Sequence, residues 1–199
     1  MKDDFLQAAM GGTKVGAAIR RPEDLDEVLG YQHIKAVFLL GGDVNFLPPL
    51  AKKVREAGNV LLVHIDLMEG IGKDAAGALL LKRMGAHGIV TTRAALARQS
   101  RELGLYVVQR FFIVDSESLR TALKVAAGQA LPDAVEVLPA TVPTYVVEEI
   151  KKELGVPVLG GGLLRTVEDA REALSKGFDA ISTSRRQIWQ AGAGLGLLM

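Results

Sequence analysis

The chain has 199 residues, 49% of them hydrophobic and 24% charged, and 24 basic against 23 acidic residues give a formal net charge of +1. This composition is typical of one globular domain, and it excludes a strongly basic nucleic-acid-binding protein, although not a local basic patch. The absence of cysteine excludes a disulfide framework, a cysteine-ligated zinc site and a cysteine nucleophile. No apolar run approaches the roughly 18 residues that a membrane-spanning helix needs. We therefore expect one domain over residues 1–199, cytoplasmic and with no membrane contact. No metal or other cofactor is predicted, and the sequence leaves open whether magnesium takes part.

Short apolar runs rich in β-branched residues recur along the chain, with glycines near their ends. Each run has the length of a strand that is buried on both faces. The eight predicted strands are residues 14–20, 36–42, 59–67, 88–92, 106–112, 134–139, 156–162 and 179–184.

Segments with a helical period separate these runs. Thr166, followed three residues later by Asp169, resembles a capping box at a helix start. A short helix over residues 4–10 could close the bottom of the fold, and residues 191–199 form a Gly/Leu-rich tail without an assigned structure. The other predicted helices are residues 22–29, 46–57, 74–84, 94–103, 116–127, 142–154, 166–175 and 185–190.

Strands that alternate with helices indicate a parallel sheet, because parallel neighbours need crossover connections. Eight such units in 199 residues, one about every 25 residues, favour a compact α/β fold, a (β/α)8 TIM-type barrel. An open, doubly wound sheet is the alternative.

The carboxyl ends of the strands form the working face of such a barrel. Three glycines, residues 160–162, follow the seventh strand, and the run Ser182-Thr183-Ser184 ends the eighth. Backbone N–H groups in such turns bind anions, and these two loops hold the phosphate in many barrels. The pattern predicts a phosphate site here. The alternative is a glycine-rich turn required only by chain geometry.

Further polar residues fall near the same strand ends. His64 and Asp66 are two apart on the third predicted strand, so we expect them to face the same way and to bind a polyol, shuttle a proton or form a structural pair. Gln109 and Arg110 end the fifth strand, and Glu136 lies on the sixth. Neither of these two strands ends in a lysine, which argues against a Schiff-base aldolase.

Several stretches in collinear order resemble the glycerol-3-phosphate-responsive antiterminator family. They include VFLLGGDVNFL, VHIDLMEGIGKD, QRFFIVDSESL and PDAVEVLPATVP, and the likeness runs from about Arg20 to Trp189. The sequence departs from the family pattern at Ala140, where Gly is common, at Gly160, where Ala is common, and at Arg93, where Lys is common. Ala140 is expected to narrow the pocket mouth.

The resemblance implies a regulator rather than an enzyme, with no catalytic residue. Loaded with glycerol 3-phosphate, such a protein binds the leader mRNA of glycerol-catabolism operons and prevents transcription termination. The phosphate would lie on Gly161, Gly162, Thr183 and Ser184. The glycerol hydroxyls would contact His64, Asp66, Gln109 or Glu136.

Basic residues near the predicted rim would supply phosphate contacts for RNA. The low aromatic content, 5%, suggests that recognition relies on backbone and shape rather than on base stacking. Some of these basic residues must instead form ion pairs with acidic residues or bind the ligand. The tentative RNA-binding residues are Arg20, Arg93, Arg110, Arg165, Arg185 and Arg186.

Two other functions remain as alternatives. One is a barrel enzyme that acts on a small phosphorylated sugar or triose, with Asp66 or Glu136 as the base. The other is a scaffold without a saturable ligand site. The sequence also leaves open whether the chain forms a homodimer.

Overall fold

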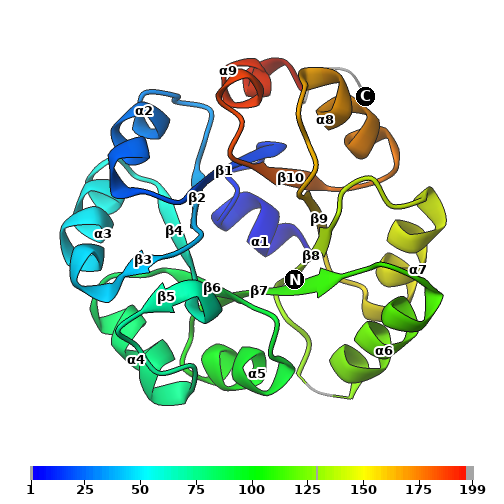
Figure 1. Ribbon diagram of the computed structural model, residues 1–199, viewed down its shortest axis with the longest axis horizontal. Coiled ribbons are helices and arrows are strands. Elements are labelled where there is room, and N and C mark those ends of the chain that lie inside the picture. The colour runs from blue at the N-terminus through cyan, green and yellow to red at the C-terminus, as the bar shows by residue number, and fades with distance from the viewer. Residues whose placement is uncertain (1, 129, 196–199) are drawn as a thin grey trace.

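A computed structural model describes residues 2–128 and 130–195 and shows a closed barrel of eight parallel strands (Figure 1). This confirms the predicted (β/α)8 fold. Neighbouring strands around the barrel follow the order β1, β2, β4, β6, β7, β8, β9, β10, and β10 closes onto β1. The barrel strands are β1 (Val15–Ile19), β2 (Ala36–Leu39), β4 (Val60–His64), β6 (Gly88–Thr91), β7 (Tyr106–Phe112), β8 (Ala134–Leu138), β9 (Val158–Gly161) and β10 (Ala180–Thr183).

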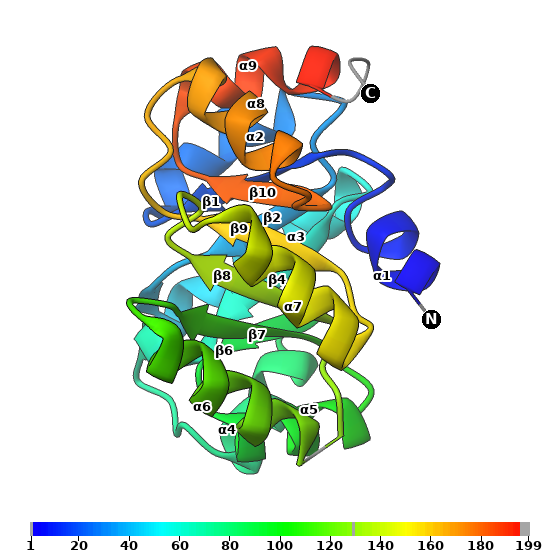
Figure 2. The ribbon, with the colours of Figure 1, turned by 90° about the vertical axis from the view of Figure 1, so that its right-hand side faces the viewer.

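The helices form a ring around the barrel, except for α1, which lies across one end of it (Figures 1 and 2). Helix starts follow local sequence signals. Asp115 and Thr166 each accept a hydrogen bond from the backbone N–H three residues on, which forms a capping box. The helices are α1 (Lys2–Ala8), α2 (Leu25–Leu29), α3 (Leu47–Glu56), α4 (Ala75–Arg83), α5 (Ala94–Glu102), α6 (Ser116–Ala127), α7 (Thr144–Leu154), α8 (Val167–Ser175) and α9 (Arg186–Leu195).

Buried apolar side chains form two separate clusters. The larger cluster fills the space between the barrel and the surrounding helices. The smaller one lies inside the barrel and joins residues such as Phe38, Leu62 and Val108 to Phe5 on α1 and to Met10 after it. Successive residues of a strand point to opposite faces, so each barrel strand serves both clusters.

Some local features differ from the sequence prediction. The last helix, predicted to stop at residue 190, continues to Leu195, which leaves residues 196–199 of the predicted tail outside the described residues. Two-residue strands β3 (Gly42–Asp43) and β5 (Met68–Glu69) pair at the rim, and three 3-10 turns lie at Pro22–Asp24, Val44–Phe46 and Ile65–Leu67. Elements this short leave no periodic pattern in the sequence.

Candidate ligand site at the carboxyl end of the barrel

A layer of polar side chains lies inside the barrel near the carboxyl ends of its strands. Leu62 and Val108 belong to the inner cluster, so the residues two positions on, His64 and Arg110, also point inward. Glu136 on β8 and Ser182 on β10 complete this layer. All four residues are buried, with Glu136 only 1% exposed.

Glu136 is the centre of a buried hydrogen-bonded group. Arg110 and Glu136 are direct partners in the β7–β8 register, and the Arg110 Nε donates to Glu136 Oε2 at 2.6 Å. The Ser182 hydroxyl donates to the other carboxylate oxygen. Burying the charges of Arg110 and Glu136 costs desolvation free energy, which their mutual hydrogen bond offsets. Because each member has a partner, the network holds the three side chains in one arrangement.

Gly161 on β9 makes this arrangement sterically possible. A Cβ atom at this position would lie 2.9 Å from Glu136 Oε1 and 3.0 Å from Ser182 Oγ, closer than side-chain carbons approach such atoms. Any larger residue would therefore displace the carboxylate or the hydroxyl.

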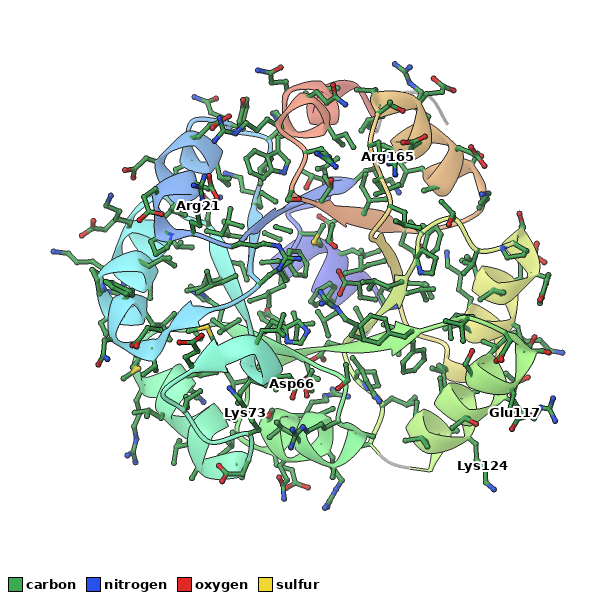
Figure 3. All side chains as sticks on the ribbon, in the orientation of Figure 1. Arg21, Asp66, Lys73, Glu117, Lys124 and Arg165 are labelled. Atoms are coloured by element: carbon green, nitrogen blue, oxygen red, sulfur yellow. The ribbon has the colours of Figure 1, made fainter. Side chains whose placement is uncertain are left out.

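A cavity of about 320 Å³ opens above this group at the mouth of the barrel. Its lining carries four arginines and a single acid, Glu136, so the cavity is cationic. Figure 3 labels Arg165 at this mouth, in the segment that leads from β9 to α8. The polar and glycine residues that line the cavity are Arg20, Arg110, Glu136, Gly162, Arg165, Ser182, Thr183, Ser184 and Arg185.

Two consecutive left-handed residues form the turn on one side of the cavity. Gly162 has φ 71° and Leu163 has φ 56°, and the Leu163 side chain is 64% exposed. A left-handed leucine is rare because its Cβ crowds the backbone. Backbone strain of this kind is often found at ligand-binding turns, and this turn borders the cavity.

The adjacent wall is the turn from β10 to α9, since β10 pairs with β9 in the barrel. The Arg185 N–H donates to Thr183 Oγ1 at 3.1 Å, and the buried Trp189 ring donates from Nε1 to the Thr183 carbonyl at 2.6 Å. Trp189 therefore packs in the core and fixes the position of Thr183 beside the cavity.

His64 lies in the polar layer but does not line the cavity. Burial and, to a smaller extent, the nearby Arg110 charge lower the pKa of His64 to about 4, while Asp66 opposes the shift. Its Nδ1 has no hydrogen-bond partner among the described residues. The imidazole is therefore neutral near pH 7.

No group of three or more potential metal ligands lies together within residues 2–128 and 130–195. In the same ranges, no helix has both the length and the apolar character needed to cross a membrane.

Comparison with known proteins matches residues 15–189 to the model of the glycerol-3-phosphate responsive antiterminator family. The chain belongs to this family. The glycerol uptake operon antiterminator regulatory protein of Listeria monocytogenes is 25% identical, with a TM-score of 0.82 over 89% of this chain and 95% of that one. An antiterminator-related protein of Thermotoga maritima is 30% identical, with a TM-score of 0.78 over 89% of this chain and 98% of that one.

Among curated proteins, YgcP of Escherichia coli K12 is 34% identical over 157 residues, which is 77% of this chain and 80% of that protein. Aldolases that are 13–16% identical share the barrel, and a likeness at that level concerns the fold alone.

The structure places the predicted phosphate residues of this antiterminator-family chain at two depths. Gly162, Thr183 and Ser184 line the mouth cavity. Gly161 is buried beneath it, and its carbonyl accepts from the Ala140 N–H at 2.7 Å. Ala140, expected to narrow the pocket, does not line it either.

Two positions expected to depart from the family pattern, Ala140 and Gly160, are spatial neighbours. A Cβ at Gly160 would lie 3.1 Å from the Ala140 Cβ, so a methyl group there would require a small shift of its neighbours.

Three of the four predicted glycerol contacts, His64, Asp66 and Gln109, do not line the cavity. The expectation that His64 and Asp66 share a strand is wrong, because β4 ends at His64 and Asp66 lies in the following 3-10 turn. Asp66 Oδ2 accepts from the Thr91 hydroxyl at 3.0 Å and from the Thr92 N–H at 2.8 Å. Gln109 points to the outer side of β7, because its neighbour Arg110 points inward.

The predicted RNA-binding arginines divide into two groups. Arg20, Arg110, Arg165 and Arg185 line the cavity. Arg93 pairs with Asp66 at 3.1 Å, and Arg186 pairs with Asp24 and Glu27 at 3.3 and 3.0 Å. Figure 3 labels Asp66, the partner of Arg93, and Arg21, which also pairs with Asp24.

Ser182 was predicted only as part of the Ser182-Thr183-Ser184 run, and Leu163 was not predicted as a site residue. The inward direction of the Ser182 side chain could have been found from the strand alternation, because Ala180, two positions earlier, points inward. No sequence signal announces the strained Leu163, since leucine is not typical of left-handed positions.

Proposed function

We propose that this member of the antiterminator family binds glycerol 3-phosphate in the mouth cavity. The loaded protein then binds the leader mRNA of glycerol-catabolism operons and prevents transcription termination in the cytoplasm. The observation that carries the proposal is the cavity itself, in which four arginines face a single glutamate.

The cavity offers different chemistry to the two ends of this ligand. Its phosphate, with a charge of about −2 near neutral pH, fits Gly162, Thr183 and Ser184, with Arg165 and Arg185 beside it. The glycerol hydroxyls would then point toward the buried group. There Ser182 and the Arg110–Glu136 pair offer both donors and acceptors. This assignment keeps Glu136 as a glycerol contact and replaces Asp66 and Gln109, while His64 supports the layer from within the barrel.

RNA binding would depend on the ligand through linkage. If the loaded form binds RNA more tightly than the empty form, then RNA must tighten ligand binding by the same factor. Arg20, Arg165 and Arg185 form no ion pair with any described residue, which leaves them available to the ligand and to RNA phosphates. Reversing the charge of Arg185 should weaken RNA binding more at low salt than at high salt.

Calorimetric titration with glycerol 3-phosphate, glycerol and inorganic phosphate tests the ligand site. We expect saturable binding of the ester, much tighter than of either fragment. Gly162→Asp should weaken this binding at least about 100-fold, because it places a carboxylate where the phosphate lies. A Cβ at Gly162 meets only Leu138 carbons, none closer than 3.5 Å, so the site has room for the change.

Gly162→Asn is the matched control, because it has the same shape and backbone strain but no charge. Equal loss in the two variants would show that the phosphate does not lie at Gly162.

Prolonged incubation of the protein with glycerol 3-phosphate separates a regulator from an enzyme. The inward polar layer contains His64, Arg110, Glu136 and Ser182 but no lysine. We expect NMR to show glycerol 3-phosphate unchanged after prolonged incubation. Turnover would instead support a barrel enzyme, and sedimentation of the loaded protein would establish whether it forms a homodimer.

A further inference from the structure

The outer side of α6 carries two surface cavities that are separate from the mouth cavity. One, of about 550 Å³, lies between α6 and the end of β7. The other, of about 580 Å³, lies along the solvent side of α6 itself. Glu117, Thr121 and Val125 line both cavities, so the two form one surface, which we call the α6 surface. The mouth cavity is lined by other segments of the chain.

Large apolar side chains are exposed on the α6 surface. Phe112 is 57% exposed, Val114 is 83% exposed and Val125 is 43% exposed, and all three line the cavity between α6 and β7. They are three of the eight large apolar side chains that are exposed in the described part of the chain. Single exposed apolar residues are normal, but a group of them around one cavity indicates a binding surface.

The charges of the α6 surface are separated along the helix. Asp115 and Glu117 lie at its start, and Lys124 lies in its last turn. Glu117 pairs with Arg120 at 3.3 Å, but these side chains are 70% and 72% exposed, and such pairs contribute little. Lys124 has no ion-pair partner among the described residues. Figure 3 labels Glu117 and Lys124, both on the outer side of α6. The surface is therefore acidic at one end and basic at the other.

This pattern favours a protein over RNA as the occupant. RNA carries a negative charge on every phosphate, and Asp115 and Glu117 lie beside the exposed Phe112 and Val114. An apolar patch with an aromatic residue, surrounded by charges of both signs, is typical of a protein–protein interface.

The α6 surface is complementary to itself. Glu117 and Lys124 are seven residues, or about two helical turns, apart on one face of α6. A two-fold axis between them, at a right angle to the helix, would place each Glu117 opposite Lys124 of a second copy. The same rotation would bring Val125, near the end of α6, toward Phe112 and Val114, which lie beside its start. A two-fold interface requires a patch of this kind, in which each half matches the other.

We propose that the chain forms a symmetric homodimer through the α6 surface, with the two α6 helices antiparallel. The axis passes near Thr121, whose small side chain lets the helices approach each other. One helix and one cavity on each copy make an interface at the small end of specific interfaces, so we expect association in the micromolar range. The inference goes beyond the proposed function and does not depend on it, because both mouth cavities stay open in this dimer.

Sedimentation velocity of the full chain across the micromolar range tests the proposal. We expect a reversible equilibrium between monomer and dimer. Lys124→Glu should weaken dimerisation at least about tenfold, because it places two acids opposite each other at both ends of the interface. Glu117→Lys should do the same by placing two bases there.

The double variant Glu117→Lys/Lys124→Glu distinguishes self-association from other binding. In an antiparallel pair its exchanged charges again face opposite charges, so dimerisation should return to within about threefold of the original. For the same reason, a mixture of the two single variants should form heterodimers although each variant alone stays monomeric. Binding to RNA or to an unrelated protein would not recover in this way.

Lys52→Glu is the matched control, because it makes the same change of charge at an exposed lysine on α3, on the other side of the barrel (Figure 1). It should leave dimerisation unchanged, and all these variants should keep the circular dichroism spectrum of the original protein.

Several results would overturn the proposal. A chain that stays monomeric at every concentration, or a dimer that tolerates Lys124→Glu, would exclude the α6 interface. Loss of dimerisation in both single variants without recovery in the double variant would exclude the antiparallel arrangement. Weaker RNA binding by Lys124→Glu in a monomeric chain would assign the surface to RNA. Binding of glycerol 3-phosphate should be the same in Lys124→Glu as in the original protein, so failure of the dimer and failure of the ligand site are measured separately.

Discussion

The two ends of the barrel use the same strands for opposite purposes. At the amino end, α1 covers the interior, and Phe5 packs edge-on against Tyr106 with ring centroids 6.0 Å apart. At the carboxyl end, the inward positions carry His64, Arg110 and Glu136 beneath an open cationic cavity. Among the described residues, the amino end is closed by a buried apolar cluster, whereas the carboxyl end holds buried charges that cost stability. Stability and binding are thereby assigned to different layers, and the following changes test this division.

The largest effect is expected from Glu136→Ala. The substitution leaves Arg110 buried without its partner, which should lower the free energy of unfolding by about 4 kcal/mol. It should also abolish binding of glycerol 3-phosphate. Urea denaturation and calorimetry measure the two effects.

The double variant Arg110→Met/Glu136→Leu provides the control. It replaces the ion pair with apolar side chains of similar size, so stability should return to near the original value while ligand binding stays lost. A double variant as unstable as Glu136→Ala would mean that the pair is required for folding rather than for binding.

Phe5→Ala makes the corresponding test at the amino end. Phe5 is 1% exposed, and its truncation leaves a cavity between α1 and the barrel. We expect a loss of about 3 kcal/mol in urea denaturation, with an unchanged affinity for glycerol 3-phosphate. A large loss of affinity would contradict the separation of the two ends.

The burial of the strands on both faces explains which features could be predicted from the sequence. Buried parallel strands are apolar on both faces, so their runs and the helices between them are visible as patterns, and the barrel follows from their number. That double burial also removes the alternation that would reveal which residues point inward. Gln109 and Arg110 are therefore both predicted at the mouth, although consecutive residues must face opposite ways.

The predicted position of Asp66 was wrong for a related reason. The apolar run continues beyond His64 through Ile65 and Leu67, so the sequence predicts a strand there. The chain instead enters a 3-10 turn after His64, which turns Asp66 toward Thr91 and Thr92. Where a strand ends depends on tertiary contacts that the apolar pattern does not contain.

His64 should make stability depend on pH. Burial lowers its pKa in the folded protein to about 4, below the 6.5 of an unfolded chain, so the unfolded state binds the proton first. Stability is therefore greatest above pH 6.5 and falls as the pH decreases toward 4. We expect a loss of about 2 kcal/mol between pH 7 and pH 5.

Urea denaturation of the protein and of His64→Leu across this range isolates the effect. The difference in unfolding free energy between the two proteins should follow the titration of one group. A difference that does not change with pH would show that His64 is not held neutral by the polar layer.

The smallest effect concerns the strained turn at the mouth. Leu163→Gly relieves a left-handed leucine, a gain of about 1 kcal/mol, but the more flexible unfolded chain offsets part of it, so stability should rise by about 0.5 kcal/mol. Affinity for glycerol 3-phosphate should fall several-fold, because glycine frees a turn that leucine holds in the binding conformation. Leu67→Gly is the control, since Leu67 is an exposed leucine in the Ile65–Leu67 turn, where φ is not positive, and should lose stability without losing affinity. Unchanged affinity in Leu163→Gly would mean that the strain belongs to the fold and not to the ligand site.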